Sequence, residues 1–554
     1  MTATDVRPAP PPEPKAEPRW RRVLGRVTTV LAALLVLAAL VLPREVGQIS
    51  PAGFVRIPVE GLAGLAILLV LPPRPRRVVA LLGGLLLALV TLLRILDMGF
   101  LVTLVRPFDP VLDWVLADDA FSFLADSVGL AGAIAAAVAA VLLVVAVFVL
   151  LTRSVLRLTR VAIAHRTASA RAVAVLSVVW LVCAVLGVQI VAPLPVASRS
   201  AAALAWQKAM QVPVTLRDEQ AFAQQARVDA FRDTPPGRLL TGLRGKDVML
   251  TFVESYGRSA VEDPRYAPQV DATLDAGTRS LAAAGYSARS AFLTSPVAGG
   301  GSWLAHATFG SGLWIDDEQR DRSLTASDRL TLTSAFKKAD WQTVGVMPGT
   351  TAAWPESRFF GIDTVYDARN LGYRGLNFSW SPMPDQYALA AYQRTEHGKP
   401  DRGPQMAEVV LTSSHVPWTP VPKLVPWDAV GDGSGYDATV RATDPPDVVW
   451  QDPQRVRDGY RDSIVYSLDS LISWVQTYGD ENLVLVFLGD HQPLPIITGD
   501  GASRDVPITI VARDRSVLDR VSSWGWQDGL HPGPTAPVWR MDAFRDRFLT
   551  AFGS

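Results

Sequence analysis

The sequence predicts two parts: an α-helical transmembrane bundle of about five spans, and then an extracellular α/β domain with a central, mainly parallel sheet. Three observations lead to this fold class. Apolar stretches of membrane-spanning length fill the first third of the chain, and arginines are concentrated in every second loop between them. After residue 244, short apolar runs alternate with helical patterns, which is typical of helices packed on a parallel sheet.

The overall composition indicates some classes of protein and argues against others. The chain has 554 residues, which suggests more than one domain. Its net charge is zero and charged residues make up 19%, so bulk charge does not indicate a nucleic-acid partner. Mean hydropathy is +0.20, and the apolar excess comes from the first third of the chain. The single cysteine, Cys183, excludes a disulfide within the chain.

The first 192 residues are expected to form a tail and a membrane domain. Residues 1–20 are rich in proline, alanine and charge, and we expect a disordered cytoplasmic tail. The transmembrane domain is expected over 21–192, with each span near the roughly 20 residues needed to cross a bilayer. The candidate spans are 23–42, 55–71, 78–96, 130–151 and 172–191. The second is short and carries Pro58 and Glu60, so four spans remain the alternative.

The loops between these stretches predict the orientation of the chain. Arginines gather before the first span, between the second and third, and between the fourth and fifth. They are Arg19, Arg21, Arg22 and Arg26; Arg74, Arg76 and Arg77; and Arg153, Arg157, Arg160, Arg166 and Arg171. Because basic loops stay in the cytoplasm, we expect a multi-pass protein of the cell membrane with a cytoplasmic amino terminus. Everything after the fifth span is then extracellular.

The remaining chain is expected to form a linker with a helix over 193–243 and an α/β domain over 244–554. The linker helix is expected at 201–231, before Pro235 and Pro236. In the α/β domain, apolar runs predict strands and amphipathic patterns predict helices. The expected strands are 247–253, 342–347, 407–413, 483–488 and 506–511, and the expected helices are 271–284, 456–478 and 541–552.

Acidic and imidazole side chains follow two of these strands. LVLVFLG runs into Asp490 and His491, and DVMLTFV runs into Glu254. Open α/β sheets bind ligands at the carboxyl ends of their strands, and carboxylates with an imidazole suit a divalent metal ion. Between the two strands, a glycine run at 299–301 precedes the hydroxyl of Ser302. The plain alternative is that these residues are surface groups at strand ends.

A carboxylate, a hydroxyl and an Asp-His pair in this order resemble the alkaline phosphatase/sulfatase superfamily. Within it, the pattern is similar to the membrane-bound phosphoglycerol transferases of the lipoteichoic acid synthase type. The resemblance implies a sulfatase-like domain with Ser302 as nucleophile and a bound Mn²⁺ ion, with Zn²⁺ as the alternative. The implied metal ligands are Glu254, Ser302, Asp490 and His491.

The sequence also departs from the pattern of the family around the nucleophile. The transferases more often have Thr where this chain has Ser302, although both hydroxyls suit the same step. The residues after Ser302 lack the Pro and Arg of the sulfatase signature, which argues against a true sulfatase. Ser295 and Thr308 are rival hydroxyls close by in the sequence.

Three further residues match, or nearly match, substrate-binding positions of the family. His415, in LTSSHVPW, corresponds to a histidine that binds the phosphoglycerol group, and it could protonate the leaving oxygen. Trp354 and Arg358 lie in GTTAAWPESRFFGID, where the family grips the headgroup. Trp354 matches its position, whereas Arg358 is displaced and the expected histidine is replaced by Met347.

The resemblance implies an enzyme that transfers a phospho-alcohol group through a covalent intermediate on Ser302. The expected group is glycerol phosphate from phosphatidylglycerol, and the expected acceptor is a cell-envelope glycolipid or glycan. A phosphoethanolamine transferase, a phosphodiesterase or sulfatase-like hydrolase, and a catalytically inactive envelope-binding relative remain alternatives. The expected partners are therefore a phospholipid donor, an envelope acceptor and the membrane, without nucleic acid.

Overall fold

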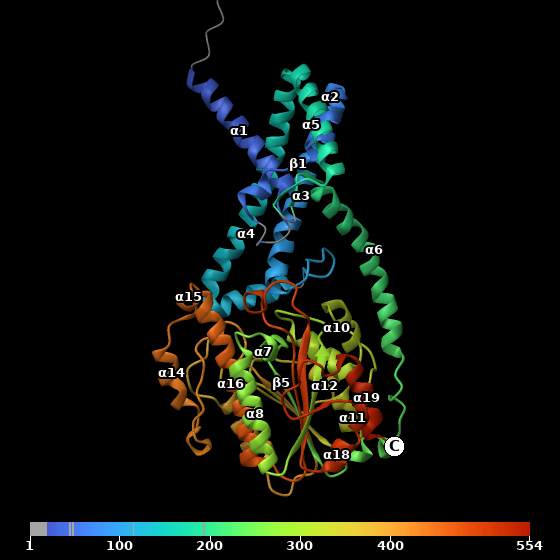
Figure 1. Cartoon of the computed structure of the whole chain (residues 1–554), viewed down its shortest axis with the longest axis vertical. Helices are drawn as coiled ribbons and strands as arrows, with labels where there is room; N and C mark the ends of the chain where they lie inside the picture. Colours follow the sequence, from blue (N-terminus) through green and yellow to red (C-terminus); the bar gives the residue numbers. More distant parts are fainter. Residues whose placement is uncertain (1–18, 44–45, 47–48, 115, 192–193, 554) are drawn as a thin grey trace, which may run out of the picture. The chain divides into compact units, whose positions relative to one another are not determined.

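The computed structural model describes the chain except residues 1–18, 44–45, 47–48, 115, 192–193 and 554 (Figure 1). The predicted tail at 1–20 lies almost wholly outside the described residues. The chain divides into two compact units. The first comprises Met1–Met98 and Ile134–Met210, and the second comprises Gly99–Ala133 and Gln211–Ser554. Residues 99–129, between the third and fourth predicted spans, therefore belong to the second unit.

The first unit is built from apolar helices. The apolar helices at this end of the chain are α1 (Arg19–Val41), α2 (Val59–Val70), α3 (Pro73–Thr103), α4 (Leu116–Ala164) and α5 (Arg166–Leu186). The more polar α6 (Ser200–Arg227) begins in the first unit, and its residues from Gln211 onward belong to the second. Among the described residues, four helices are long and apolar enough to cross a membrane. They are Trp20–Val41, Pro73–Thr103, Gly129–Ala164 and Arg166–Leu186.

The second predicted span, 55–71, is a shorter helix than expected. Helix α2 has 12 residues, which at about 1.5 Å per residue is well short of a bilayer's hydrocarbon core of about 30 Å. Prolines limit it at both ends, because Pro58 immediately precedes α2 and Pro72 follows closely after it. The described residues therefore contain four helices of spanning length, and α2 is a shorter apolar helix beside them.

Buried polar contacts hold parts of the first unit together. Arg94 of α3 is fully buried and donates hydrogen bonds to the backbone carbonyls of Ala39, Leu40 and Leu42 at the end of α1. One turn further along α3, Asp97 accepts a 2.7 Å hydrogen bond from the ammonium of Lys208 on α6. Charged groups that are paired in this way are the kind that an apolar environment tolerates.

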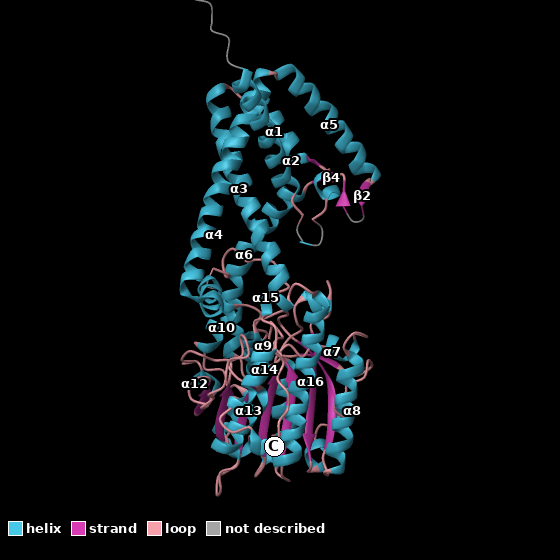
Figure 2. Ribbon diagram, turned by 90° about the vertical axis from the view of Figure 1, so that its left-hand side faces the viewer, coloured by secondary structure: helices cyan, strands magenta, loops and turns pink. Residues whose placement is uncertain are grey.

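A nine-stranded mixed sheet forms the centre of the second unit (Figure 2). Its order is β12-β6-β11-β10-β5-β9-β7-β8, and β13 also pairs with β6. The strands are β5 (Asp247–Val253), β6 (Ser287–Thr294), β7 (Gln342–Met347), β8 (Thr364–Asp367), β9 (Gln405–Leu411), β10 (Leu483–Gly489), β11 (Asp505–Ala512), β12 (Gln527–Asp528) and β13 (Val538–Arg540). The run from β10 through β5, β9 and β7 to β8 is parallel, whereas β11 is antiparallel to both β10 and β6. The predicted mainly parallel sheet is confirmed.

Helices cover both faces of this sheet, and β5 shows how its residues divide between them. Met249 and Val253 face a core formed with α8 (Ala267–Ala283) and α16 (Pro453–Tyr478). Val248, Leu250 and Phe252 face a second core. The second core also includes α9 (Ser302–Ser311), α11 (Leu332–Lys338) and α19 (Ala543–Phe552). A strand buried on both faces reads as a continuous apolar run, which is why it was predictable.

Candidate active site

Three neighbouring parallel strands bring the candidate residues to one edge of the sheet. β10, β5 and β9 lie side by side in that order. β5 runs into Glu254, β10 into Asp490 and His491, and β9 into the loop that carries His415. Because the carboxyl ends of parallel strands meet at the same edge, residues far apart in the sequence are brought together.

Four of the predicted residues converge at this edge. The hydroxyl of Ser302 lies 2.9 Å from Oε2 of Glu254 and 3.1 Å from Nε2 of His491. Nε2 of His491 lies 3.3 Å from Oε1 of Glu254 and 3.9 Å from Oδ2 of Asp490. One ligand atom each from Glu254, Asp490 and His491 fits within a 4.8 Å span, and all three side chains are buried.

Asp490 presents one of its two oxygens to this cluster. Its Oδ1 accepts hydrogen bonds from the backbone amides of Ser255 at 2.8 Å and His491 at 2.7 Å. Its Oδ2 is buried and has no hydrogen-bond donor in the described part of the chain. Gly489 makes this turn possible, because a Cβ there would lie 1.8 Å from the Tyr256 carbonyl oxygen. A buried carboxylate oxygen without a donor is costly unless a cation completes its environment.

Backbone contacts orient the other two ligands. Nδ1 of His491 donates to the carbonyl of Gln492 at 2.9 Å, which leaves Nε2 directed at the cluster as a potential ligand. Oε1 of Glu254 accepts a 2.9 Å hydrogen bond from the hydroxyl of Ser255. Ser255 has a φ of +56°, an unusual conformation for a non-glycine residue. Strain of this kind is found at functional sites, where the surrounding structure holds it in place.

The charges of the cluster depend on one another. Burial and the neighbouring Glu254 raise the pKa of Asp490 to about 8. Burial would lower the pKa of His491, but Asp490 and Glu254 outweigh it and raise this pKa to about 9. Burial also opposes ionisation of Glu254, yet His491 and His415 hold its pKa well below the usual value. Two carboxylates thus compete for one cationic partner, which is the arrangement a divalent metal ion would relieve.

The donor set fits a divalent metal ion. Two carboxylates, one imidazole nitrogen and a hydroxyl oxygen supply the oxygen and nitrogen ligands that Mn²⁺ and Zn²⁺ accept in proteins. The unpartnered Oδ2 of Asp490 and the tautomer of His491 both favour this interpretation. The described residues contain no thiolate at the site, since Cys183 lies on α5.

Ser302 is the hydroxyl that faces the cluster. It is the first residue of α9, which follows Gly301 at a φ of +83°. That left-handed conformation favours glycine and turns the chain sharply into the helix. The rival hydroxyls are engaged elsewhere: Ser295 donates to the carbonyl of Asp490 at 2.6 Å, and Thr308 donates to that of Ile315 at 3.2 Å. Both rivals are fully buried, whereas Ser302 is partly exposed.

His415 lies beside the cluster and is held by an aromatic residue that the sequence did not reveal. Its ring stacks on Trp380 with centroids 3.6 Å apart. Nδ1 donates to the carbonyl of Val416, so in the neutral ring Nε2 is unprotonated and can accept a proton. Burial lowers the pKa of His415, opposed by the nearby Glu254. Trp380 lies in a loop without periodicity, so only its residue type could have drawn attention to it.

A buried aspartate fixes the loop that carries His415. Oδ1 of Asp385 accepts from the backbone amides of Thr412 at 2.7 Å and Ser413 at 2.9 Å. Its Oδ2 accepts a 2.5 Å hydrogen bond from the hydroxyl of Ser467. Burial raises the pKa of Asp385 to about 6. Asp385 is therefore a positioning residue for the loop after β9, and its sequence position in the first turn of the short helix α13 (Asp385–Tyr392) gave no sign of this role.

Trp354 and Arg358 contact residues other than the proposed metal ligands. Trp354 packs against Phe360, with ring centroids 5.7 Å apart, at the border of the second core. Arg358 is exposed on the short helix α12 (Ser357–Phe360) and makes no hydrogen bond or ion pair with the cluster within the described residues. Met347, at the end of β7, is buried. Substrate binding by Trp354 and Arg358 therefore stays a prediction.

The segment between α3 and α4 forms part of the surroundings of the nucleophile loop. A Cβ on Gly299, whose φ is +77°, would lie 2.5 Å from the carbonyl oxygen of Thr103. Arg106 and Asp113 form a double hydrogen bond of 2.7 and 2.8 Å within this segment. Nearby, Asp109 accepts from Gln211 of α6 at 2.6 Å. The glycine run before Ser302 is thus packed against a segment that precedes it by nearly 200 residues.

Comparisons with known proteins found similar structures but no matching sequence family. No protein-family model and no curated protein matches this sequence. The lipoteichoic acid synthase LtaP from Listeria monocytogenes aligns at 14% identity and a TM-score of 0.39, over 57% of this chain and 76% of its own. A protein of the alkaline phosphatase superfamily from Vibrio parahaemolyticus aligns at 16% identity and a TM-score of 0.33, over 54% and 69%.

A third neighbour is the Streptococcus pyogenes phosphoglycerol transferase GacH in complex with sn-glycerol-1-phosphate. It aligns at 12% identity and a TM-score of 0.34, over 60% of this chain and 90% of its own. These structures include the superfamily and the branch that the sequence motifs resemble. With TM-scores below 0.5 and identities below 25%, these three likenesses concern the fold alone.

Proposed function

We propose that this protein is a metal-dependent phosphotransferase anchored in the cell membrane. One observation carries the proposal: the Ser302 hydroxyl faces Glu254 and His491, while Oδ2 of Asp490 points into the same cluster without a donor. The group transferred is a phospho-alcohol, glycerol phosphate from phosphatidylglycerol, as the motif resemblance implies. The acceptor is a hydroxyl of a cell-envelope glycolipid or glycan.

The metal ion would be held by Glu254, Asp490, His491 and the Ser302 oxygen. When bound, it supplies a positive charge that lowers the pKa of a coordinated hydroxyl and offsets charge on a phosphoryl oxygen. Ser302 has no adjacent His-Asp pair of the triad type, so its activation depends on these neighbours. Glu254, whose Oε2 lies 2.9 Å from the hydroxyl, is the group that can receive its proton.

The transfer consists of two displacements at phosphorus. In the first, Ser302 Oγ forms a bond to the phosphorus of the donor, and the bond between phosphorus and the diacylglycerol oxygen breaks. In its imidazolium form, His415 gives the departing oxygen a proton from Nε2, so diacylglycerol leaves as a neutral alcohol. In the second, the acceptor hydroxyl attacks the phosphorus and loses its proton to His415. The bond between phosphorus and Ser302 Oγ breaks, and Oγ recovers its proton from Glu254.

The test uses the purified full-length protein, phosphatidylglycerol labelled in its diacylglycerol part, and added Mn²⁺ or Zn²⁺. We expect metal-dependent release of diacylglycerol, and Ser302→Ala should lower it at least about 1000-fold, since loss of the attacking atom removes covalent catalysis. The matched control is Ser516→Ala, an exposed serine in the first turn of another helix, α18 (Arg515–Asp519). It should release diacylglycerol at the rate of the native chain.

The outcomes separate the remaining alternatives. Release of diacylglycerol with free glycerol phosphate as the sole other product would identify a hydrolase, because water then replaces the acceptor. Release from phosphatidylethanolamine but not from phosphatidylglycerol would identify the other headgroup. Equal activity of Ser302→Ala and the native chain would refute the covalent mechanism. Failure to bind metal, together with no release from any phospholipid, would favour an envelope-binding protein.

A further inference from the structure

Two helices of the first unit separate at the end where the arginines gather. α3 and α4 touch closely at Gly84, where a Cβ would lie 2.8 Å from the Cα of Thr152. Towards the start of α3, the gap between the two helices becomes a cavity of about 630 Å³. That volume is within the range of ligand-binding sites in proteins, about 300 to 1,000 Å³.

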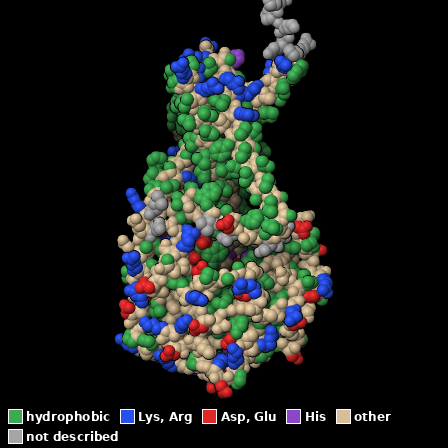
Figure 3. Space-filling model, turned by 180° about the vertical axis from the view of Figure 1, so that it is seen from behind, with side chains coloured by type: hydrophobic (Ala, Val, Ile, Leu, Met, Phe, Trp, Pro, Cys, Tyr) green, Lys and Arg blue, Asp and Glu red, His purple; other side chains and the backbone are tan. Residues whose placement is uncertain are grey.

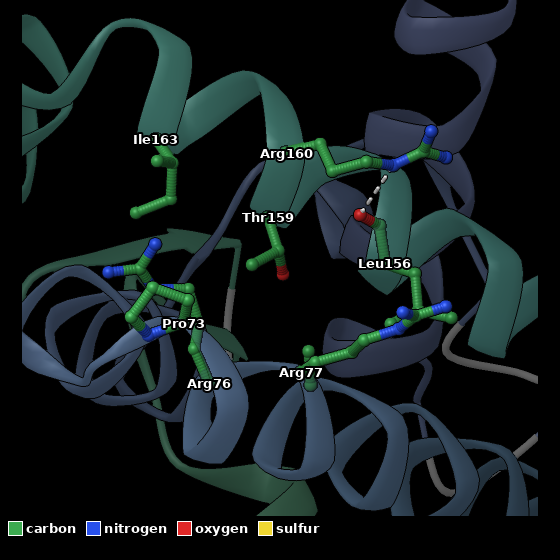
Figure 4. A pocket seen from close by; sticks show the side chains of 8 residues that line it. Pro73, Arg76, Arg77, Leu156, Thr159, Arg160 and Ile163 are labelled. Atoms are coloured by element: carbon green, nitrogen blue, oxygen red, sulfur yellow. Dashed lines mark hydrogen bonds between the residues drawn. The ribbon is translucent and has the colours of Figure 1, made fainter.

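Three arginines give the cavity positive charge, and most of its other lining residues are apolar. Figure 4 shows Arg76 and Arg77 of α3 on one side and Arg160 of α4 on the other, with Thr159 between them. Ala80, Leu156 and Ile163 complete much of the apolar lining. No carboxylate lines the cavity. Three guanidinium groups around an apolar floor match an anion that is attached to an apolar body.

One arginine of the cavity has an unused buried donor. Arg76 gives one hydrogen bond to the carbonyl of Leu71, but its Nε is buried without a partner among the described residues. Arg160 donates through Nε to the carbonyl of Leu156 at a long 3.4 Å, and its guanidinium is otherwise open. Arg77 is exposed at the cavity. These groups hold donors that a phosphate could accept from.

The charge around the cavity has one sign. Figure 3 shows the Lys and Arg side chains gathered at this end of the helices. Over residues 19–41, 68–90 and 140–186, the sequence contains arginines and His165 but neither aspartate nor glutamate. The cavity therefore has no internal counter-charge in these segments, and the arginine pattern predicts that this end is cytoplasmic.

We infer that the cavity between α3 and α4 binds the phosphate headgroup of an anionic phospholipid from the cytoplasmic leaflet. The three arginines hold the phosphate, and the acyl chains lie along the apolar, exposed surfaces of the neighbouring helices. Charge complementarity and the position in a membrane helix pair favour a lipid over a soluble anion. This site is separate from the cluster around Ser302 and does not depend on the proposed transfer reaction.

The test is native mass spectrometry of the delipidated full-length protein in a neutral detergent, titrated with phosphatidic acid or phosphatidylcholine. We expect one phosphatidic acid to be retained more tightly than any phosphatidylcholine. The variant Arg76→Gln/Arg77→Gln/Arg160→Gln should weaken this retention at least about 10-fold, since each arginine contributes charge-assisted hydrogen bonds. If the triple variant does not fold, Arg77→Gln alone serves, because Arg77 is exposed.

The matched control removes the same charge from the same end of the protein. Arg21→Gln/Arg166→Gln/Arg171→Gln changes three arginines that do not line the cavity. It should weaken retention less than about threefold, through loss of long-range attraction alone. Equal weakening by both triple variants would refute a built site and leave only general surface charge. No preference for phosphatidic acid would also refute it, and displacement of the lipid by equimolar inorganic phosphate would refute lipid recognition.

Discussion

Replacement of Asp490 separates metal binding from folding. In Asp490→Asn, the side-chain oxygen can still accept from the amides of Ser255 and His491, so the end of β10 keeps its contacts. The amide nitrogen then occupies the place of Oδ2, and an amide NH₂ group donates protons and does not ligate a cation. Without metal, we expect an unfolding temperature no lower than that of the native chain, because one of two competing buried carboxylates is removed. The stabilisation that metal gives the native chain should be lost.

The size of this effect follows from mass action. A metal ion at 100 times its dissociation constant stabilises a protein by about 2.7 kcal/mol. Loss of a charged ligand should weaken binding by about 100-fold or more, which leaves about 0.4 kcal/mol at the same concentration. The unit that holds the site has roughly 380 residues, so about 0.8 kcal/mol corresponds to one degree near its Tm. The expected shifts are about 3 °C for the native chain and under about 1 °C for the variant.

The assay is thermal unfolding of the full-length protein after treatment with EDTA, with Mn²⁺ and Zn²⁺ titrated separately. Asp500→Asn is the control, because Asp500 is an exposed carboxylate ten residues further along the same segment. It should show the full shift. The reasoning would be refuted if Asp490→Asn kept the full metal-induced shift, or if the native chain showed no shift with either ion.

Three more predictions concern the second unit. Burial raises the pKa of Glu408 on β9 to about 7. With respect to Glu408, the folded protein is therefore most stable below about pH 4.5, and this stability is lost as pH rises through 7. Glu408→Gln should therefore stabilise the protein by up to about 3 kcal/mol at pH 8 but not at pH 4.5, measured by urea unfolding; equal effects at both pH values would contradict this. Asp229 forms a fully buried ion pair with Arg545 at 2.7 Å, and Asp229→Asn should cost about 3 to 5 kcal/mol, whereas the exposed Asp233→Asn should cost almost nothing. Burial alone would raise the pKa of Asp229, but Arg545 holds it below the usual value, so this stabilisation is present above about pH 4 and lost in more acidic solution. Gly299→Ala should reduce diacylglycerol release at least about tenfold, because the new Cβ meets a backbone oxygen, while the metal-induced shift in unfolding temperature persists. Gly300→Ala is the control, because its Cβ meets only the side chain of Leu104, at 3.3 Å. If Gly300→Ala were equally impaired, the contact of residue 299 with the backbone oxygen would not be the cause.

The strands and ligands that were predictable share one property. β5 and β10 are buried on both faces, so their apolar runs are unbroken and the polar residues that follow are conspicuous. Glu254 and Asp490 could therefore be placed at strand ends before the order of the strands was known. Their proximity needed one further fact, which is that β10 and β5 are parallel neighbours. The sequence resemblance implied only that these residues share one site, because strand composition does not reveal which strands pair.

Other features were missed because their cause is tertiary. β6 has the sequence SARSAFLT, whose polar first half is only partly buried, and it is a strand because β11 pairs along its whole length. Asp385 resembles any acidic residue in the first turn of a helix, yet it holds the loop of His415. The contact of Thr103 with Gly299 joins segments nearly 200 residues apart. Local patterns carry no information about such contacts.

Two buried acidic sites in the same unit show why the cluster around Ser302 points to function. The side chain of Asp229 is fully buried and meets Arg545 at 2.7 Å, so its charge is compensated within the fold. Glu254 and Asp490 are equally buried, but in the described part of the chain their ion-pair partner is His491 alone. Two carboxylates facing one imidazole lower the stability of the fold, and hydrophobic residues would serve structure better. An arrangement that costs stability yet gathers a hydroxyl, two carboxylates and an imidazole at strand ends is best explained by a bound cation and the chemistry it supports.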